Sequence, residues 1–301
     1  MSVPASYLAV VLLWSTTPLA IQWSGNGVGF AFGAFARMLI GLCALLLIIR
    51  LWKLPLPWDM HARRVYRVGG ISLYLVMSCV YWSAQFIPSG WLSVIFGLSP
   101  LFTSMLAAMI LETGPVTGGR LFGLLLGLAG LAIVFAEGFS LSTAALLGVA
   151  GVTVGAFSQS LGAVLLQKLK PGMPAVSITA GSLIVALPLF ALSCVFSAGW
   201  PAVFPSRTML SILYLALLGT ALGFPLYFYL LKHISAERVA LVALITPVCA
   251  LLLGSALNGE VISNRVWLGT ACVLCGLAWY EYGKYLPLKK TWWIRWKQRP
   301  M

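Results

Sequence analysis

Acidic residues are scarce in this chain. Only six of its 301 residues are Asp or Glu, against 19 Lys and Arg, and charged residues make up 8% of the total while hydrophobic residues make up 61%. A water-soluble globule needs a far more charged surface than this. The composition therefore excludes an ordinary soluble domain and indicates a chain that is surrounded by lipid.

Residues that carry out catalysis or bind metals are also sparse. The two histidines, His61 and His233, are far apart in the sequence, and neither an HExxH nor a GxSxG motif occurs. An enzyme inside the membrane needs a clustered nucleophile, metal ligands or paired acids. We therefore expect no enzymatic activity, no cofactor and no bound metal.

Apolar runs fill most of the chain. A helix needs about 20 apolar residues to cross roughly 30 Å of hydrocarbon. Ten runs approach that length: 4–22, 29–49, 68–86, 90–111, 120–136, 143–166, 174–196, 208–231, 235–256 and 265–286. Because a helix satisfies its own backbone hydrogen bonds in lipid, these runs predict an all-α integral membrane protein with ten transmembrane helices.

Two segments that lie 147 residues apart echo each other. Ile87–Pro100 reads IPSGWLSVIFGLSP and Ile234–Pro247 reads ISAERVALVALITP, so each ends in a Ser-Pro or Thr-Pro pair inside an apolar run. An acidic residue follows each segment, Glu112 or Glu260, and then comes a run punctuated by glycines. A nearly constant offset across a helix, a loop and the next helix indicates an internal repeat.

The repeat divides the chain into two halves of five runs each. Residues 1–139 form the first repeat, residues 140–288 form the second, and residues 289–301 form a basic, Trp-rich tail suited to the head-group interface. Since five is odd, the second half is expected to enter the bilayer in the opposite sense from the first. Inverted repeats are a recurring basis for alternating access, so this organisation indicates a transporter.

The basic residues lie mainly on one side of the predicted topology. Sixteen are on the side of both termini: Arg50, Lys53, Arg63, Arg64, Arg67, Arg120, Lys168, Lys170, Lys232, Arg238, Lys284, Lys289, Lys290, Arg295, Lys297 and Arg299. The other side has only Arg207 and Arg265. The positive-inside rule then places both termini in the cytoplasm. Topology and attraction to anionic lipid head groups explain the net charge of +13 without a nucleic-acid partner.

Several segments resemble a known family. They are LLWSTTPLAI (12–21), FARML (35–39), LSPLFTSMLAAMILE (98–112) and ITPVCALLLGSALNGE (245–260), each half closing with a glycine-punctuated run. In this order, over residues 5–286, the chain resembles the drug/metabolite transporter superfamily and specifically its ten-helix EamA-type members. The resemblance implies a central cavity surrounded by helices 1, 3, 4, 6, 8 and 9, and a small-molecule substrate whose identity it does not specify.

Aromatic, hydroxyl and amide side chains in these helices are the candidate cavity residues. They are Trp14, Thr17, Tyr74, Ser78, Tyr81, Ser99, Ser158, Gln159, Phe224, Tyr227 and Thr246. Such a lining suits amphipathic organic solutes, by stacking and apolar contact, with cation–π attraction for a cationic group. The competing explanation is that Trp and Tyr residues near helix ends form belts at the membrane interfaces.

Prolines inside the runs are candidate helix breaks or hinges. Pro18, Pro100, Pro225 and Pro247 each remove a backbone hydrogen bond. Corresponding interruptions in the two halves of a transporter point to a site near the middle of the membrane. The alternative is that these prolines are ordinary for membrane helices, with Ser99 and Thr246 re-satisfying the loosened backbone.

Arg37 is the only ionisable residue that is expected well inside a run. A charge at that depth needs water, backbone carbonyls or a partner. One interpretation is that Arg37 binds a substrate carboxylate; the other is a structural role, which the resemblance favours because helix 2 of the family is peripheral to the cavity. No carboxylate is expected at the same depth, so proton coupling through a central acid is not expected.

These observations predict an exporter of small organic metabolites, such as amino acids or drug-like aromatic compounds, in the cell inner membrane. We expect a monomer or a weak homodimer. The alternative function is a channel or a non-transporting partner subunit, which also uses repeated helices; an intramembrane enzyme is a further alternative, for which the sequence shows no clustered catalytic residues. If the cavity assignment is correct, replacing Tyr81 or Trp14 by Ala impairs transport without preventing membrane insertion.

The predicted topology can be tested by accessibility labelling. Single cysteines at positions 60 and 290, in a background without the six native cysteines, are expected to react with a membrane-impermeant reagent from the same face of the membrane. Both positions belong to the basic, cytoplasmic side. Labelling from opposite faces contradicts two five-helix halves with opposite orientation.

Overall fold

Helices make up every regular element in the described part of the chain. The structure is a computed structural model that describes residues 2–111, 118–136, 142–197, 204–244, 246–259 and 262–282. The elements are α1 (Val3–Gly25), α2 (Phe30–Leu51), α3 (Met60–Ser83), α4 (Ser89–Phe96), α5 (Ser99–Ile110), α6 (Gly118–Ala136), α7 (Thr143–Leu169), α8 (Ala175–Phe196), α9 (Ser206–Tyr214), the π-helix η1 (Leu215–Leu222), α10 (Gly223–His233), α11 (Ala236–Ala240), the 3₁₀-helix η2 (Leu241–Leu244), α12 (Thr246–Asn258) and α13 (Asn264–Tyr282).

Seven stretches within the described residues are long and apolar enough to cross a membrane. They are α1, α2, α3, α4–α5, α7, α8 and α9–α10. The three other predicted runs, 120–136, 235–256 and 265–286, overlap α6, α11–α12 and α13, which are not among these seven. The protein is therefore an all-α, multi-pass membrane protein.

Polar side chains begin several helices by capping the free N–H groups of the first turn. The Asp59 carboxylate accepts hydrogen bonds from the backbone N–H groups of His61 and Ala62, at 3.0 and 3.3 Å, and so caps α3. Ser142 and Ser235 cap α7 and α11 in the same way. Short polar links thus fix where the apolar helices start.

Two of the helical runs are interrupted, each beside a proline. The first run leaves the α-helix at Gly97 and Leu98 and resumes as α5, with Pro100 in the first turn. The second passes from α11 through η2 to α12, which begins at Thr246 and has Pro247 as its second residue. A proline costs little in the first turn because the N–H that it lacks has no helical partner there.

The other two candidate hinge prolines lie within helices. Pro18 is inside α1, where it removes one backbone hydrogen bond. Pro225 lies in the first turn of α10, directly after the π-helix η1.

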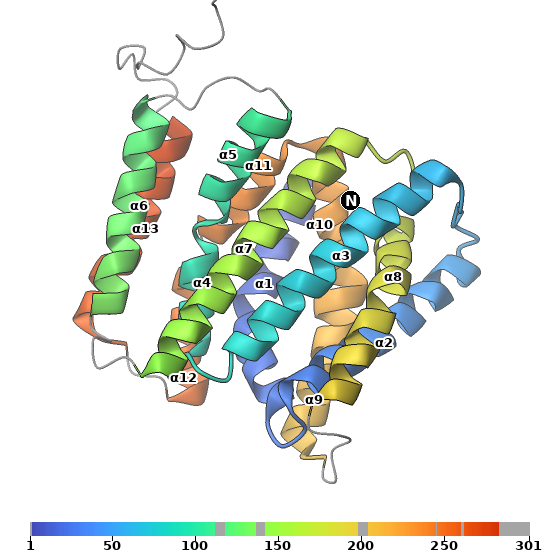
Figure 1. The fold of residues 1–301 in the computed structure, drawn as a ribbon, viewed down its shortest axis with the longest axis horizontal. Helices are drawn as coiled ribbons and strands as arrows, with labels where there is room; N and C mark the ends of the chain where they lie inside the picture. Colours follow the sequence, from blue (N-terminus) through green and yellow to red (C-terminus); the bar gives the residue numbers. More distant parts are fainter. Residues whose placement is uncertain are drawn as a thin grey trace, which may run out of the picture.

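The two interrupted helices lie side by side within the bundle and run in opposite directions (Figure 1). α4 packs against α12, and α5 packs against α11, so the early segment of one interrupted helix meets the late segment of the other. α6 and α13 lie side by side at one edge of the bundle, and α2 and α8 lie toward the opposite edge. Both interruptions are therefore enclosed by other helices.

Glycines bring the backbones of α6 and α13 into contact. A Cβ atom added to Gly123 would lie 2.4 Å from the carbonyl oxygen of Gly276, and one added to Gly130 would lie 2.6 Å from that of Gly269. A Cβ on Gly276 would lie 2.5 Å from the backbone nitrogen of Gly127. Small residues permit this approach in lipid, where dispersion contacts between helices replace the hydrophobic effect.

Some of the sequence features fall outside the described residues. These are the tail 289–301, the boundary between residues 139 and 140, and the acidic residues Glu112, Glu137 and Glu260. The predictions made for them remain predictions.

The glycine contact between α6 and α13 predicts that alanine substitutions at Gly276 and Gly127 have different effects on stability. Gly276→Ala forces the two backbones apart, and we expect it to lower the free energy of unfolding by about 1–3 kcal/mol, as overpacking does elsewhere. Gly127→Ala is the matched control, since a Cβ there has no atom within 4 Å. Thermal unfolding of both variants in detergent measures the difference, and equal stability contradicts the close packing.

Candidate functional site

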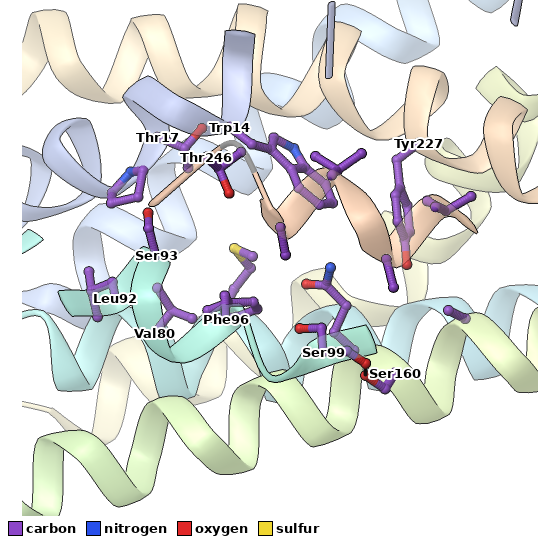
Figure 2. A pocket seen from close by; sticks show the side chains of 18 of the residues that line it. Trp14, Thr17, Val80, Leu92, Ser93, Phe96, Ser99, Ser160, Tyr227 and Thr246 are labelled. Atoms are coloured by element: carbon purple, nitrogen blue, oxygen red, sulfur yellow. Dashed lines mark hydrogen bonds between the residues drawn. The ribbon is translucent and has the colours of Figure 1, made fainter. Parts of the chain in front are cut away.

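A cavity of about 100 Å³ lies in the interior of the bundle (Figure 2). Its lining comes from α1, α3, α4, α5, α7, α10, α11, η2 and α12, with Arg37 added from α2. Both helix interruptions border this cavity, through Ser99 at the start of α5 and Thr246 at the start of α12.

Aromatic rings form one wall of the cavity. The rings of Trp14 on α1 and Tyr227 on α10 are 5.1 Å apart between centroids and inclined by 36°. Phe224, one turn before Tyr227, and Phe96 at the end of α4 also line the space. Tilted rings at this separation present both faces and edges to a bound solute.

A few polar groups interrupt this apolar lining. The Ser160 hydroxyl donates to the carbonyl oxygen of Ser99 at 3.1 Å and to that of Ala156 at 3.0 Å, and the Thr17 hydroxyl donates to Leu13 at 2.8 Å. These hydroxyls satisfy nearby backbone carbonyls while their oxygens remain acceptors. The cavity thus combines a large apolar surface with a small number of hydrogen-bonding groups.

Most of the candidate residues from the sequence meet at this cavity. Those that line it are Trp14, Thr17, Ser99, Gln159, Phe224, Tyr227 and Thr246, together with Pro18 and Arg37. Those that do not are Tyr74, Ser78, Tyr81 and Ser158, together with Pro100, Pro225 and Pro247.

Tyr74 and Tyr81 of α3 point into helix interfaces instead. The Tyr74 hydroxyl is 2.7 Å from Ser193 Oγ on α8, and its ring packs edge-on against Phe190. Tyr81 is 1% exposed, and its hydroxyl accepts a hydrogen bond from Ser24 of α1 at 3.4 Å. Buried tyrosines need such partners, and a neighbouring helix supplies them here.

The two serines outside the cavity also face neighbouring helices. Ser78 borders a separate hollow lined by residues of α2 and α8. The carbonyl of Ser158 accepts a hydrogen bond from the Ser72 hydroxyl of α3 at 3.1 Å. Helix α3 therefore contributes the apolar side chains of Met77 and Val80 to the cavity, not its polar and aromatic face.

Other lining residues were missed by sequence reasoning. They include Met77, Val80, Leu92, Ser93, Phe96, Thr103 and Ser160. Ser93 lies in the repeated segment, and Ser160 is adjacent to Gln159, so position offered some signal for these two. The apolar residues offered none, because an apolar side chain facing a cavity looks the same in sequence as one facing a helix or lipid.

Arg37 is buried at the edge of the cavity. It is 1% exposed, and its Nε donates to Thr220 Oγ1 at 2.9 Å. One terminal nitrogen contacts the Met77 sulfur at 3.8 Å, and the guanidinium carbon lies 5.8 Å from the centre of the Phe224 ring. Among the described residues that line the cavity, Arg37 is the one with a formal charge.

Glycines and the π-helix make room for this arginine. Thr220 belongs to η1, and π-turns are concentrated at functional sites. A Cβ on Gly41 would lie 2.5 Å from the Thr220 methyl, and a Cβ on Gly219 would lie 3.1 Å from a terminal nitrogen of Arg37. The close approach of α2 to η1 therefore depends on two residues without side chains.

A membrane-embedded helical bundle with an amphipathic cavity where two interrupted helices meet has the architecture of a small-molecule transporter. The chain belongs to the EamA-like transporter family, whose sequence pattern matches residues 5–136 and again residues 146–281. The resemblance drawn from the sequence is therefore confirmed, and the family consists of transporters and not of enzymes.

Three individual relatives share between 25% and 29% sequence identity with this chain. The chain is 25% identical to the transporter YoaV of Bacillus subtilis (strain 168), over 90% of this chain and 93% of that protein. It is 29% identical to the inner membrane transporter YedA of Escherichia coli (strain K12), over 67% of this chain and 65% of YedA. A protein of the same strain described as a probable amino-acid metabolite efflux pump is 26% identical, over 63% of this chain and 66% of that protein.

A solved crystal structure has the same fold. The two chains superpose with a TM-score of 0.68 at 20% sequence identity, over 92% of this chain and 96% of the other. The whole described bundle, and not one half of it alone, thus has a counterpart among known structures.

The contact between Gly41 and Thr220 yields a second prediction. Gly41→Ala pushes Thr220 away from Arg37, and we expect it to lower the free energy of unfolding by about 1–3 kcal/mol. Adding Thr220→Ser removes the methyl that the new Cβ meets while keeping the hydroxyl, so the double variant is expected to recover part of the loss. Thermal unfolding measures both; no loss in Gly41→Ala, or no recovery in the double variant, contradicts the contact.

Proposed function

We propose that this protein exports small amphipathic organic metabolites across the cell inner membrane, using the cavity as its substrate site. The observation that carries the proposal is the position of the cavity. It lies where two interrupted helices, one from each EamA-like segment, pack against each other. Interrupted helices at the interface of repeats mark the substrate sites of many transporters.

The packing of the two halves supports ten membrane spans and transport by alternating access. α1 contacts α9, α10 and α12, and α7, which begins the second half, contacts α3 and α5 in the corresponding way. α6 and α13 have 19 residues each, enough for about 28 Å of helix. Two such halves with opposite orientation exchange conformations to open the cavity to one side or the other.

The names of relatives favour efflux of amino-acid-like compounds. One relative is described as an amino-acid metabolite efflux pump and another as an inner membrane transporter. The bias of basic residues favours cytoplasmic termini. The aromatic wall at Trp14 and Tyr227 suits the apolar part of such a solute.

Trans-stimulation distinguishes a carrier from a channel. We expect purified protein in proteoliposomes to take up radiolabelled L-phenylalanine saturably, and faster when the lumen holds unlabelled L-phenylalanine. A carrier responds in this way because the loaded site returns faster than the empty one, whereas a pore does not. Uptake that neither saturates nor responds to internal substrate contradicts the proposal.

Trp14 and Trp82 form a matched pair for locating the substrate. Trp14→Ala removes an aromatic wall of the cavity, and we expect at least about a tenfold loss in kcat/KM. Trp82 packs against Phe86 outside the cavity, with ring centroids 5.0 Å apart, so Trp82→Ala is expected to leave transport near that of the unchanged protein. Equal effects of the two substitutions contradict the cavity as the site.

A further inference from the structure

We propose that Arg37 is the carboxylate-binding residue of the cavity, and that the substrates are organic anions or zwitterions with an apolar body. This inference rests on the proposed function, because it names the chemical class of solute that the same cavity takes. It assigns Arg37 a direct contact with substrate and not only a structural role.

The charge of Arg37 lacks a counter-charge within the described residues. Its polar contacts are Thr220 Oγ1 and the Met77 sulfur, and its ring contact is Phe224, all of which are uncharged. Removing an ion from water without an opposite charge costs several kcal/mol. A structural role by itself gives no reason for keeping such a cation beside a cavity, whereas a ligand carboxylate supplies the missing charge.

The guanidinium retains donors for a ligand. Arginine has five N–H donors, and the two hydrogen bonds above use two of them, one to a weak sulfur acceptor. Its planar fork binds a carboxylate through two parallel hydrogen bonds. The contact with Thr220 uses Nε and so fixes the plane of the group.

The surroundings hold this arginine in one position. Thr220 is fully buried in the π-helix η1, and Gly41 and Gly219 permit the approach of α2 and η1. An arginine held in place loses less conformational entropy when it binds a ligand than a free one does. The pair is thus built as a site, with its orientation fixed before a solute arrives.

The rest of the cavity fits the body of such a solute. Trp14, Phe224 and Tyr227 offer stacking surfaces, while Gln159 and Ser99 offer hydrogen bonds. Because Phe224 touches both the cavity and the guanidinium, an aromatic carboxylate can place its ring and its charged group on adjacent surfaces.

Four probes that share a phenyl ring separate charge from shape. They are L-phenylalanine, 3-phenylpropanoate, the neutral 3-phenylpropan-1-ol and the cationic 2-phenylethylamine. Equilibrium binding to the purified full chain is measured in detergent by titration calorimetry. We expect the two carboxylates to bind about 10- to 100-fold more tightly than the alcohol, as a charge-assisted hydrogen-bond pair provides, and the amine to bind most weakly.

Substitutions then test whether Arg37 causes that preference. Arg37→Gln is expected to reduce the ratio of propanoate to propanol affinity to near one, and Arg37→Lys is expected to retain part of it. Thr220→Val keeps the charge of Arg37 but removes the hydrogen bond that fixes the plane of its guanidinium. It is therefore expected to lower the ratio of propanoate to propanol affinity less than Arg37→Gln does. Thr179→Val, a change at a buried threonine of α8 outside the cavity, is the control and keeps the ratio of the unchanged protein.

The outcomes separate this inference from the proposed function. An equal carboxylate preference in the unchanged protein and in folded Arg37→Gln overturns the role of Arg37, as does tighter binding of the amine. If Arg37→Gln does not fold, an unchanged ratio in both Arg37→Lys and Thr220→Val overturns it. If binding depends on Arg37 but exchange is not trans-stimulated, the proposed export is contradicted, whereas the assignment of Arg37 as the carboxylate-binding residue is supported.

Discussion

The absence of hydrogen-bonding partners in hydrocarbon is the constraint on which this structure depends. Each backbone group inside the membrane has to be satisfied by the protein, so the chain crosses the membrane as helices. The chain departs from the α-helix at Gly97 and Leu98, in η1 and in η2, and residues at or next to each departure line the cavity or contact Arg37. Irregular backbone and the site therefore occur together for one physical reason.

The same constraint explains where the hydroxyl groups go. Ser160 donates to the carbonyl of Ser99, the first residue of α5, which directly precedes Pro100, and Thr17 donates to Leu13 one turn before it. Tyr74 and Tyr81 pair with serines of neighbouring helices. A polar side chain in a membrane bundle can thus stabilise the structure without facing a ligand, so polarity by itself does not identify a site residue.

Close helix contacts were partly visible in the sequence. Glycines recur at equivalent places in the two halves, and Gly123, Gly130 and Gly276 do bring α6 and α13 together. The approach of Gly41 to Thr220 was not visible, because it joins α2 to a π-turn in the other half of the chain. The spacing of glycines indicates which face of a helix carries small residues, but it does not show which other helix packs against that face.

Composition, run length and order along the chain are enough to establish the membrane environment, the helical class, the repeat and the family. The sequence also located most polar cavity residues on α1, α5, α7, α10 and α12. The packed bundle was needed to show that α3 turns Met77 and Val80 to the cavity, and that Arg37 reaches it from α2. Helix rotation and contacts between distant segments set these features, and neither leaves a periodic signal in an almost uniformly apolar chain.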